Sequence, residues 1–246
     1  KHFNKCETWD LLEKEFGDIT YETGFENIAK FLDEKIKEGV SIYGDAYIIG
    51  CFFYPFPEYA YIKHLSKHRA HFRIWDDEIF QNGHLYDFLE AQSLEDLYTT
   101  FRKMRIHGDF TAQQFAIDMN YSSLFNFSEN DFVITGPGSI RGIERTFQDA
   151  RKCDYVGVIK WVHKNFEELL YEFEKETGMK FTPLPNRLPT LIDLQNCFCE
   201  TDKYCRGAGI NPSDLKIKGK KIKHTYTESR NKISYIFPEK WGVKLD

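Results

Sequence analysis

The sequence predicts a mainly α-helical fold with two lobes. Most of its 246 residues fall into segments where apolar positions recur every three or four residues, which is the spacing of an amphipathic helix. Glycines end several of these segments, and the Gly-Pro-Gly run at 136–138 joins two of them through a tight turn. The chain is longer than a typical domain, but a bilobed helical body can hold all of it, so we expect one domain, 1–246, with two lobes around a shared core.

Five helices are expected in the first half of the chain. Gly17 and Gly39 end the first two, and Gly108 closes the fourth, which begins at a capping-box spacing of Ser93 and Asp96. An aromatic stretch interrupted by Gly and Pro, 42–56, is expected to be a buried connection. The expected helices are Cys6 to Phe16, Thr23 to Glu38, Glu58 to Phe72, Ser93 to about Met104, and Asp109 to about Tyr121.

The second half begins with a predicted helix-turn-helix hairpin at 132–150, whose second helix runs to about Ala150. One long helix is then expected from Val156 to Thr177, with Gly178 as its stop. After a Pro-rich connection, Thr190 is expected to cap a last helix that ends near Arg206. The segment 207–246 is a basic tail, interpreted as a strand or a flexible arm.

Composition restricts the function classes. The formal net charge of −5 excludes a uniformly basic coat, so a surface that binds nucleic acid has to be a local patch. Six cysteines show no regular framework, and no apolar run approaches the roughly 18 residues of a membrane span. We therefore expect a reduced, cytoplasmic protein without a membrane partner. The chain opens with Lys1 and no signal-peptide core, so a trimmed start is expected.

The hairpin turn is the first candidate for function. The Gly136-Pro137-Gly138 run bends the backbone tightly, and the helix that follows offers free N–H groups and a positive dipole end to an anion such as a DNA phosphate. A plain helix-helix turn explains the glycines equally well. No Gly-Lys-Ser/Thr follows, which excludes a nucleotide P-loop. The DNA-binding candidates are Gly136, Gly138, Ser139, Arg141, Gly142 and Arg145, with Lys220 and Lys221 of the tail.

Polar residues share one face of the helix before the hairpin. Gln114, Asp118 and Tyr121 follow each other at i, i+4 and i+7. The simpler interpretation is a solvated face. The functional interpretation places a carboxylate beside the hairpin.

A second polar face lies on the last helix, where Asp193, Asn196, Glu200 and Lys203 repeat at helical spacing. Glu200 and Lys203 are compatible with a mere surface ion pair. In a cleft, the carboxylate would instead stabilise charge or activate water, and the lysine would bind phosphate or act as a nucleophile.

Metal sites are not expected. The spacing of Cys197, Cys199 and Cys205 matches neither zinc knuckles nor the usual iron–sulfur runs. His64, His68 and His71 share a helical face that has the spacing of a zinc site. Because lysine and arginine surround them, a basic, solvated or phosphate-facing helix is the preferred interpretation. Neither a metal nor a cofactor is therefore predicted.

Three blocks resemble a known family: Phe110 to Asp118, Gly136 to Gly142, and Asn196 to Tyr204. They are similar to the α-glutamyl/putrescinyl thymine pyrophosphorylase family. That family is related to the helical domain of hydroxymethyluracil DNA kinases, and some relatives resemble antiviral glycosylases that remove modified bases from phage DNA. The resemblance covers about residues 110–206 and implies a mainly α, bilobed fold with the helix-hairpin-helix architecture of DNA glycosylases.

The resemblance also favours catalytic roles for Gln114, Asp118, Glu200 and Lys203. The chain departs from the better-known glycosylases in one respect. Those enzymes carry a catalytic Asp shortly after the hairpin, where this chain has only Asp149 and Asp154, both expected at helix ends.

These features predict a DNA glycosylase that flips a hypermodified pyrimidine, such as glucosylated hydroxymethylcytosine, out of double-stranded phage DNA and cleaves its N-glycosidic bond in antiviral defence. Asp118 and Glu200 are expected to converge in a cleft beside the hairpin. The alternatives are a transferase that acts on activated thymine derivatives in DNA and a DNA-binding module without catalysis. Modified-base DNA is the expected partner in all three, and the oligomeric state is left open.

Overall fold

The computed structural model describes residues 2–44, 57–104, 106–210 and 235–244, and these are mainly helical. Within these ranges there is no β-strand, only an isolated antiparallel bridge between Leu184 and Arg187. The prediction of a mainly α fold is therefore confirmed.

The chain divides into two compact units. Unit 1 comprises residues 1–92 and 96–118, and unit 2 comprises residues 93–95 and 119–246. Each unit is described by itself below. The expectation that they form one domain stays a prediction.

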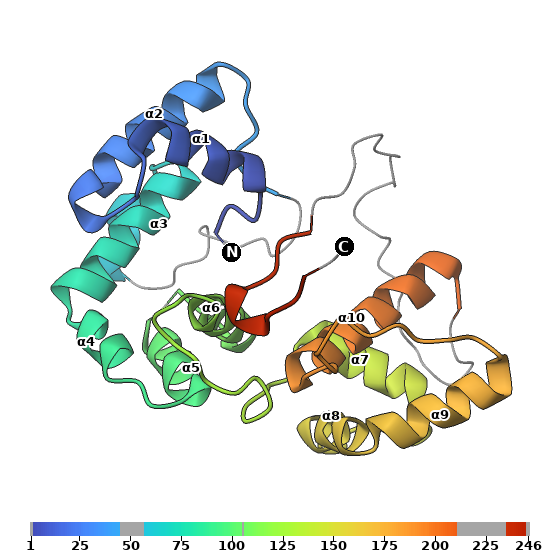
Figure 1. The fold of residues 1–246 in the computed structure, drawn as a ribbon. Helices are drawn as coiled ribbons and strands as arrows, with labels where there is room; N and C mark the ends of the chain where they lie inside the picture. Colours follow the sequence, from blue (N-terminus) through green and yellow to red (C-terminus); the bar gives the residue numbers. More distant parts are fainter. Residues whose placement is uncertain (1, 45–56, 105, 211–234, 245–246) are drawn as a thin grey trace. The chain divides into compact units, whose positions relative to one another are not determined.

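Unit 1 contains the first helices of the chain (Figure 1). Its first two α-helices match the predicted segments closely, because Gly17 and Gly39 adopt positive φ angles of 66° and 88° that glycine tolerates best. The elements are α1 (Cys6–Phe16), η1 (Tyr21–Thr23), α2 (Phe25–Lys37), η2 (Pro57–Ile62), α3 (Lys67–Trp75), η3 (Asp76–Gln81), α4 (His84–Leu89), α5 (Leu94–Lys103) and α6 (Asp109–Asn120). The last two helices cross the boundary between the units.

A buried apolar cluster joins α1, α2 and α3. Phe16, Phe25 and Trp75 pack around it while keeping part of their surface exposed. The high aromatic content of the sequence is thus used in the core of this unit. The buried members are Phe3, Leu12, Ile28, Ala29, Leu32, Ile42 and Phe72.

The helix predicted from Glu58 to Phe72 is wrong in its bounds. A 3-10 turn, η2, occupies its first part, and α3 begins only after Ser66, which takes an extended conformation at ψ 155°. The stretch expected at 42–56 lies largely outside the described residues.

The interpretation of the histidines as a solvated, basic face is also wrong. His68 and His71 are buried on α3, at 1% and 0% exposure, and only His64 is exposed. His68 Nε2 lies 2.9 Å from Asp33 Oδ1, and His71 Nδ1 lies 3.1 Å from Nδ1 of His2. Burial among aromatic rings lowers the pKa of His2, so this part of the core favours neutral imidazoles.

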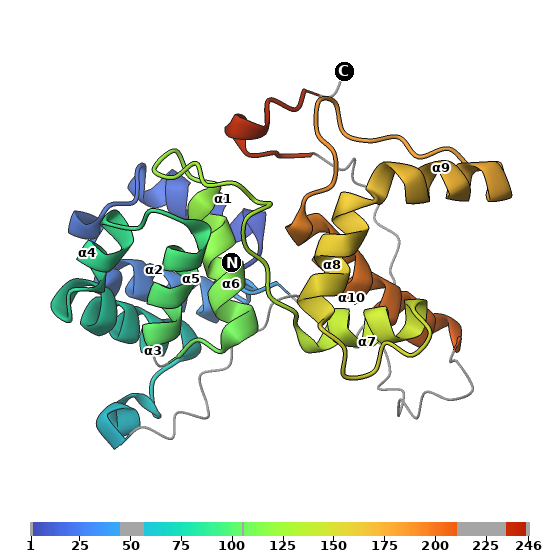
Figure 2. The same ribbon diagram turned by 90° about the horizontal axis from the view of Figure 1, so that it is seen from below.

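Unit 2 contains α7 (Pro137–Thr146), α8 (Tyr155–Lys164), α9 (Phe166–Thr177), α10 (Leu191–Ala208) and the short η4 (Glu239–Trp241). Figure 2 shows α7 and α10 side by side, and these two helices form the most extensive helix–helix contact in the described chain. Thr190 caps the start of α10, as predicted, and its backbone N–H donates to the Asp193 side chain at 2.9 Å.

The single helix predicted from Val156 to Thr177 is two helices. Asn165 leaves the helical conformation at φ −104° and ψ 16°. Its side-chain amide donates to the Trp161 carbonyl at 2.7 Å, a local bond of the kind by which Asn competes with helix continuation. Gly178 ends α9 in the left-handed conformation, as predicted.

The last described segment, 235–244, packs back on unit 2. Trp241 Nε1 donates to Glu129 at 2.7 Å, and the Arg187 guanidinium lies 3.7 Å from the centre of the indole ring. Arg187 also bonds Glu129 at 2.8 Å and Asp193 at 2.5 Å. This part of the predicted basic tail is therefore anchored on the start of α10.

Among the described residues, no helix is both long and apolar enough to cross a membrane.

Candidate functional site

Within the range of the predicted hairpin, 132–150, the structure has one helix, α7, which ends at Thr146 and packs closely on α10. A Cβ atom built on Gly142 would lie 1.9 Å from the Phe198 carbonyl oxygen, and one on Gly138 would lie 2.4 Å from Cys199 Sγ. A larger residue at Gly142 would require α10 to move, because the close atoms belong to its backbone, whereas at Gly138 the Cys199 side chain would have to turn away. The two glycines thus let the helix backbones approach each other closely.

Ser139 and Gln195 connect the Gly136–Gly138 turn to the first turns of α10. Ser139 Oγ accepts from the Gly136 backbone N–H at 3.0 Å, and Gln195 Nε2 donates to the same hydroxyl at 3.2 Å. Both side chains belong to residues with 0% exposure. Because buried polar groups need partners, this short chain of bonds orients the first turn of α7.

Asp202 is the electrostatic centre of the helix pair. Its carboxylate is 0% exposed and pairs with three arginines: Arg141 Nη2 at 2.9 Å, Arg145 Nε at 3.0 Å and Arg206 Nε at 3.1 Å. Burial alone would raise the pKa of the Asp202 carboxyl, but hydrogen bonds from Arg141 and Arg145 outweigh it and hold the pKa below the usual range. Asp202 is therefore a carboxylate at neutral pH.

The arginines around Asp202 carry more charge than it neutralises. Three guanidinium groups face one carboxylate, so these four side chains together carry an excess of positive charge. Arg145 is almost fully enclosed, at 2% side-chain exposure, and also donates to the Ile210 carbonyl. Arg141, near the start of α7, keeps 35% of its side chain exposed. The positive charge is therefore accessible to solvent at Arg141.

The DNA-binding candidates fall into distinct positions. Gly142 and Ser139 are buried in the α7–α10 contact, as is the Arg145 side chain, so their observed role is to hold the two helices together. Arg141 remains reachable from solvent. Lys220 and Lys221 lie outside the described residues. Contact of any of these residues with DNA stays a prediction.

The polar face of α10 is split by burial. Lys203 Nζ lies 2.5 Å from Glu200 Oε1, and the two side chains are 50% and 62% exposed. Asp193 is engaged by Arg187 and by the cap of the helix. Glu200 and Lys203 therefore form the surface ion pair that was the simpler interpretation, and a catalytic role for them stays a prediction.

On α6, the polar face is not uniformly solvated. Gln114 is 3% exposed, and its Nε2 has no hydrogen-bond partner among the described residues. Asp118 is half-buried. Asp118 and Glu200 belong to different units, so their convergence in one cleft stays a prediction.

The sequence interpretation missed Asp202. A usable signal exists, because Leu191, Gln195, Phe198 and Asp202 follow each other at spacings of four, three and four residues. That is the buried stripe of α10, and a carboxylate on such a stripe needs cationic partners. Arg206, one turn further along, is such a partner.

No group of three or more His, Cys, Asp or Glu side chains within the described part of the chain is arranged to hold a metal ion. Burial, the main cause, raises the pKa of the Cys199 thiol, and the Cys197 thiol is shifted in the same direction for the same reason. Both therefore favour the thiol form, which binds metal poorly.

Fold and site together define a helical domain whose hairpin is tied to its last long helix by a buried carboxylate and three arginines. The family described as "5-hmdU DNA kinase, helical domain" matches residues 1–211. The chain therefore belongs to this family. The pyrophosphorylase family suggested by the sequence blocks is not confirmed, although its link to hydroxymethyluracil DNA kinases is consistent with the match.

A curated relative supports the same assignment. The chain is 21% identical, over 96% of its length, to the 5-hmdU DNA kinase of Bacillus phage SP10. It spans 37% of the length of that relative. No solved structure matches the chain.

The comparisons overturn the prediction that the chain is a DNA glycosylase. The named relative is a kinase, which transfers a phosphoryl group, and the family carries the same name. A glycosylase breaks an N-glycosidic bond with water, which is a different reaction. The hairpin and the carboxylates that suggested base excision are compatible with both reactions, so they could not distinguish them.

Proposed function

We propose that this chain is the DNA-engaging helical part of an enzyme that transfers a group to the 5-hydroxymethyl position of a pyrimidine in DNA. This corresponds to the base-modifying transferase alternative of the sequence analysis. Family membership supplies the substrate class, since 5-hmdU is a deoxyuridine with a hydroxymethyl group at carbon 5.

The observation that carries the proposal is the arginine cluster on Asp202. DNA presents a row of negative charges, and a protein of net charge −5 needs a local excess of cations to bind it. The Asp202 cluster supplies that excess beside the α7–α10 contact, with 35% of the Arg141 side chain exposed. A guanidinium that is oriented by a buried carboxylate is pre-organised to contact phosphate.

The chemical step of such an enzyme is a group transfer to an oxygen atom. The hydroxymethyl oxygen attacks the phosphorus of a phosphoryl donor, its proton is removed by a base, and the donor's leaving group departs. Asp118 and Glu200 are the candidates for the base, because a carboxylate can accept a hydroxyl proton. Gln114 and Lys203 would orient the substrate or hold its flanking phosphate.

A direct assay tests the proposal. The chain is incubated with duplex DNA that contains 5-hmdU at one position, with Mg²⁺ and a nucleoside triphosphate, and the DNA is then digested to nucleosides and analysed by mass spectrometry. A matched duplex with thymidine at that position is the control. We expect tighter binding of the 5-hmdU duplex than of the thymidine duplex, and a 5-hmdU mass increased by one phosphate group where the chain also carries out the transfer.

The other outcomes separate the alternatives. Tight binding of both duplexes without any change of the base would support the DNA-binding module instead. Binding of neither duplex at low salt would contradict the proposal as a whole, because the cluster would then have no nucleic-acid role.

A further inference from the structure

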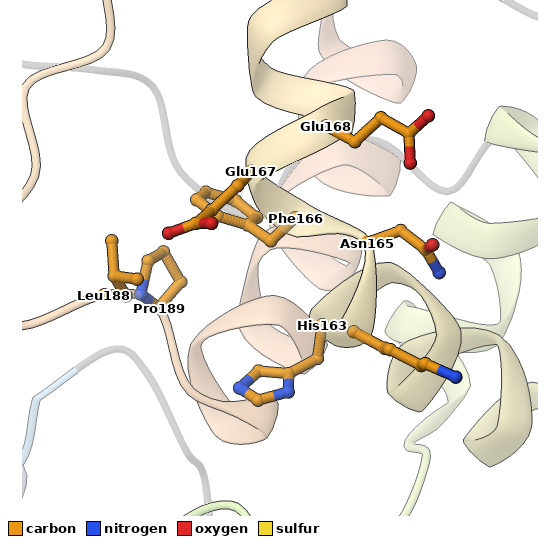
Figure 3. Close-up of a pocket in the computed structure, with 8 residues that line it drawn as sticks. His163, Asn165, Phe166, Glu167, Glu168, Leu188 and Pro189 are labelled. Atoms are coloured by element: carbon orange, nitrogen blue, oxygen red, sulfur yellow. The ribbon is translucent and has the colours of Figure 1, made fainter.

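A cavity at the junction of α8 and α9 is the strongest unassigned feature of unit 2. Its volume is about 320 Å³. That value is at the lower end of the range for small-molecule sites, which suits one nucleoside rather than a larger cofactor. Figure 3 shows that its walls come from the helix junction on one side and from the Leu188–Pro189 segment on the other.

The cavity has an apolar body. Phe166 lines it from α9, and the ring of Phe166 is braced edge-on by Phe181 with the centroids 5.9 Å apart. Leu188 and Pro189 form the facing wall, and Leu188 is 52% exposed although it is apolar. An aromatic ring opposite a proline and a leucine leaves a slot suited to a flat ligand.

Two polar groups line this slot. In Figure 3 the Glu167 carboxylate extends toward Leu188 and Pro189, and the His163 ring lies on the same side of the helix, while Asn165 and Glu168 extend to the other side. Among the described residues, no hydrogen bond or ion pair joins the side chain of His163 or Glu167 to another side chain. Both are therefore available to a ligand.

We propose that this cavity binds a pyrimidine base of the uracil type, with a ring N–H beside a carbonyl group. The Glu167 carboxylate is an acceptor and would take the ring N–H, and a His163 N–H would donate to the neighbouring carbonyl oxygen. The base itself stacks on Phe166.

The inference rests on the proposed function, because it identifies a place for the base on which that enzyme acts. The same pair of side chains also predicts a preference among bases. Cytosine presents an unprotonated ring nitrogen where uracil has an N–H, so a carboxylate at that position finds no donor and faces a lone pair. The cavity should therefore distinguish thymidine and 5-hmdU from deoxycytidine.

The test is nucleoside binding by the whole chain, followed by NMR shifts of backbone amides. Thymidine and 5-hydroxymethyl-2′-deoxyuridine should shift signals at 163–168 and 188 in a saturable way, and 2′-deoxycytidine should bind at least about tenfold more weakly. Glu167→Gln should weaken thymidine binding by about tenfold and remove the preference over deoxycytidine, since an amide can also donate.

Glu172→Gln is the matched control, because Glu172 is an exposed glutamate of the same helix outside the cavity. It should bind thymidine like the parent chain. The inference is overturned if thymidine causes no saturable shift at the junction, or if Glu167→Gln and Glu172→Gln bind equally well. If the chain modifies 5-hmdU in DNA but nucleosides cause no NMR shift at the cavity, only this inference is overturned. If nucleosides bind at the cavity but the chain binds no DNA, only the proposed function is overturned.

Discussion

The Asp202 carboxylate accepts a hydrogen bond from Arg145 Nε at 3.0 Å, and both side chains are almost completely enclosed, at 0% and 2% exposure. The pair connects the end of α7 to the last turns of α10. A buried ion pair does not stabilise a fold more than good apolar packing would, but removing one partner leaves the other charge without compensation. The α7–α10 contact therefore depends on Asp202 being present and ionised.

Replacing that carboxylate should weaken unit 2 strongly. Asp202→Asn leaves three guanidinium groups around a neutral amide, and we expect the free energy of unfolding to fall by about 3 kcal/mol. Urea unfolding followed by circular dichroism measures this. Glu200→Gln, on the exposed face of the same helix, is the control and should have little effect. Equal stabilities of the two variants would contradict the central role of Asp202.

The glycine at the helix contact should tolerate no side chain. Gly142→Ala places a methyl group against the Phe198 carbonyl, so α7 and α10 must separate, at a cost of about 3 kcal/mol, near the upper end of overpacking effects. Gly108→Ala is the matched control, because a Cβ at Gly108 meets nothing within 4 Å. Thermal unfolding compares the two variants. A parental melting temperature for Gly142→Ala would show that the helices are not this close.

Arg141 should contribute to the salt dependence of DNA binding. Under the proposed function, Arg141→Gln removes one phosphate contact, so the slope of log affinity against log salt should decrease by about 1. Fluorescence anisotropy with a labelled duplex at several salt concentrations measures that slope. Lys175→Gln, an exposed substitution on α9, should leave it unchanged. An unaltered slope for Arg141→Gln would exclude this contact.

His107 should make unit 1 sensitive to acid. Burial, with a smaller effect of His71, lowers the pKa of His107 to about 3, and neither ring nitrogen has a hydrogen-bond partner among the described residues. Between that value and the unfolded pKa of about 6.5, the unfolded chain binds a proton that the folded chain does not. The free energy of unfolding should therefore keep its full value above pH 6.5 and decrease as the pH falls towards 3.

The matching experiment is urea unfolding at a series of pH values. A difference of one bound proton corresponds to a slope of about 1.4 kcal/mol per pH unit. His107→Phe should therefore reduce the slope of the free energy of unfolding against pH, between about pH 3 and 6.5, by up to that amount. Phenylalanine keeps the ring contacts with Phe101 and Phe115. His64→Phe, at an exposed position, should leave the pH dependence as it is. If both variants follow the parental pH profile, His107 does not cause the acid sensitivity.

Local chemistry explains which elements the sequence by itself determined. The ends of α1 and α9 were predictable because Gly17 and Gly178 take positive φ angles that stop a helix, and the start of α10 was predictable because Thr190 precedes an apolar helical repeat. Arg141 and Arg145 were recognisable as neighbours from their spacing alone.

Only the tertiary structure decided what those residues do. The glycines of the hairpin were compatible with phosphate approach and with helix packing, and the contact of Gly142 with Phe198 identifies the second. The partner of Arg141 and Arg145 is 57 residues or more away, at Asp202, and no local pattern specifies that pairing. The spacing of residues along a helix shows which of them share a face, because the helical repeat depends only on neighbours in the sequence. Which charge a face meets depends on the packing of distant segments, so the sequence pattern indicated the cations while the fold supplied their carboxylate.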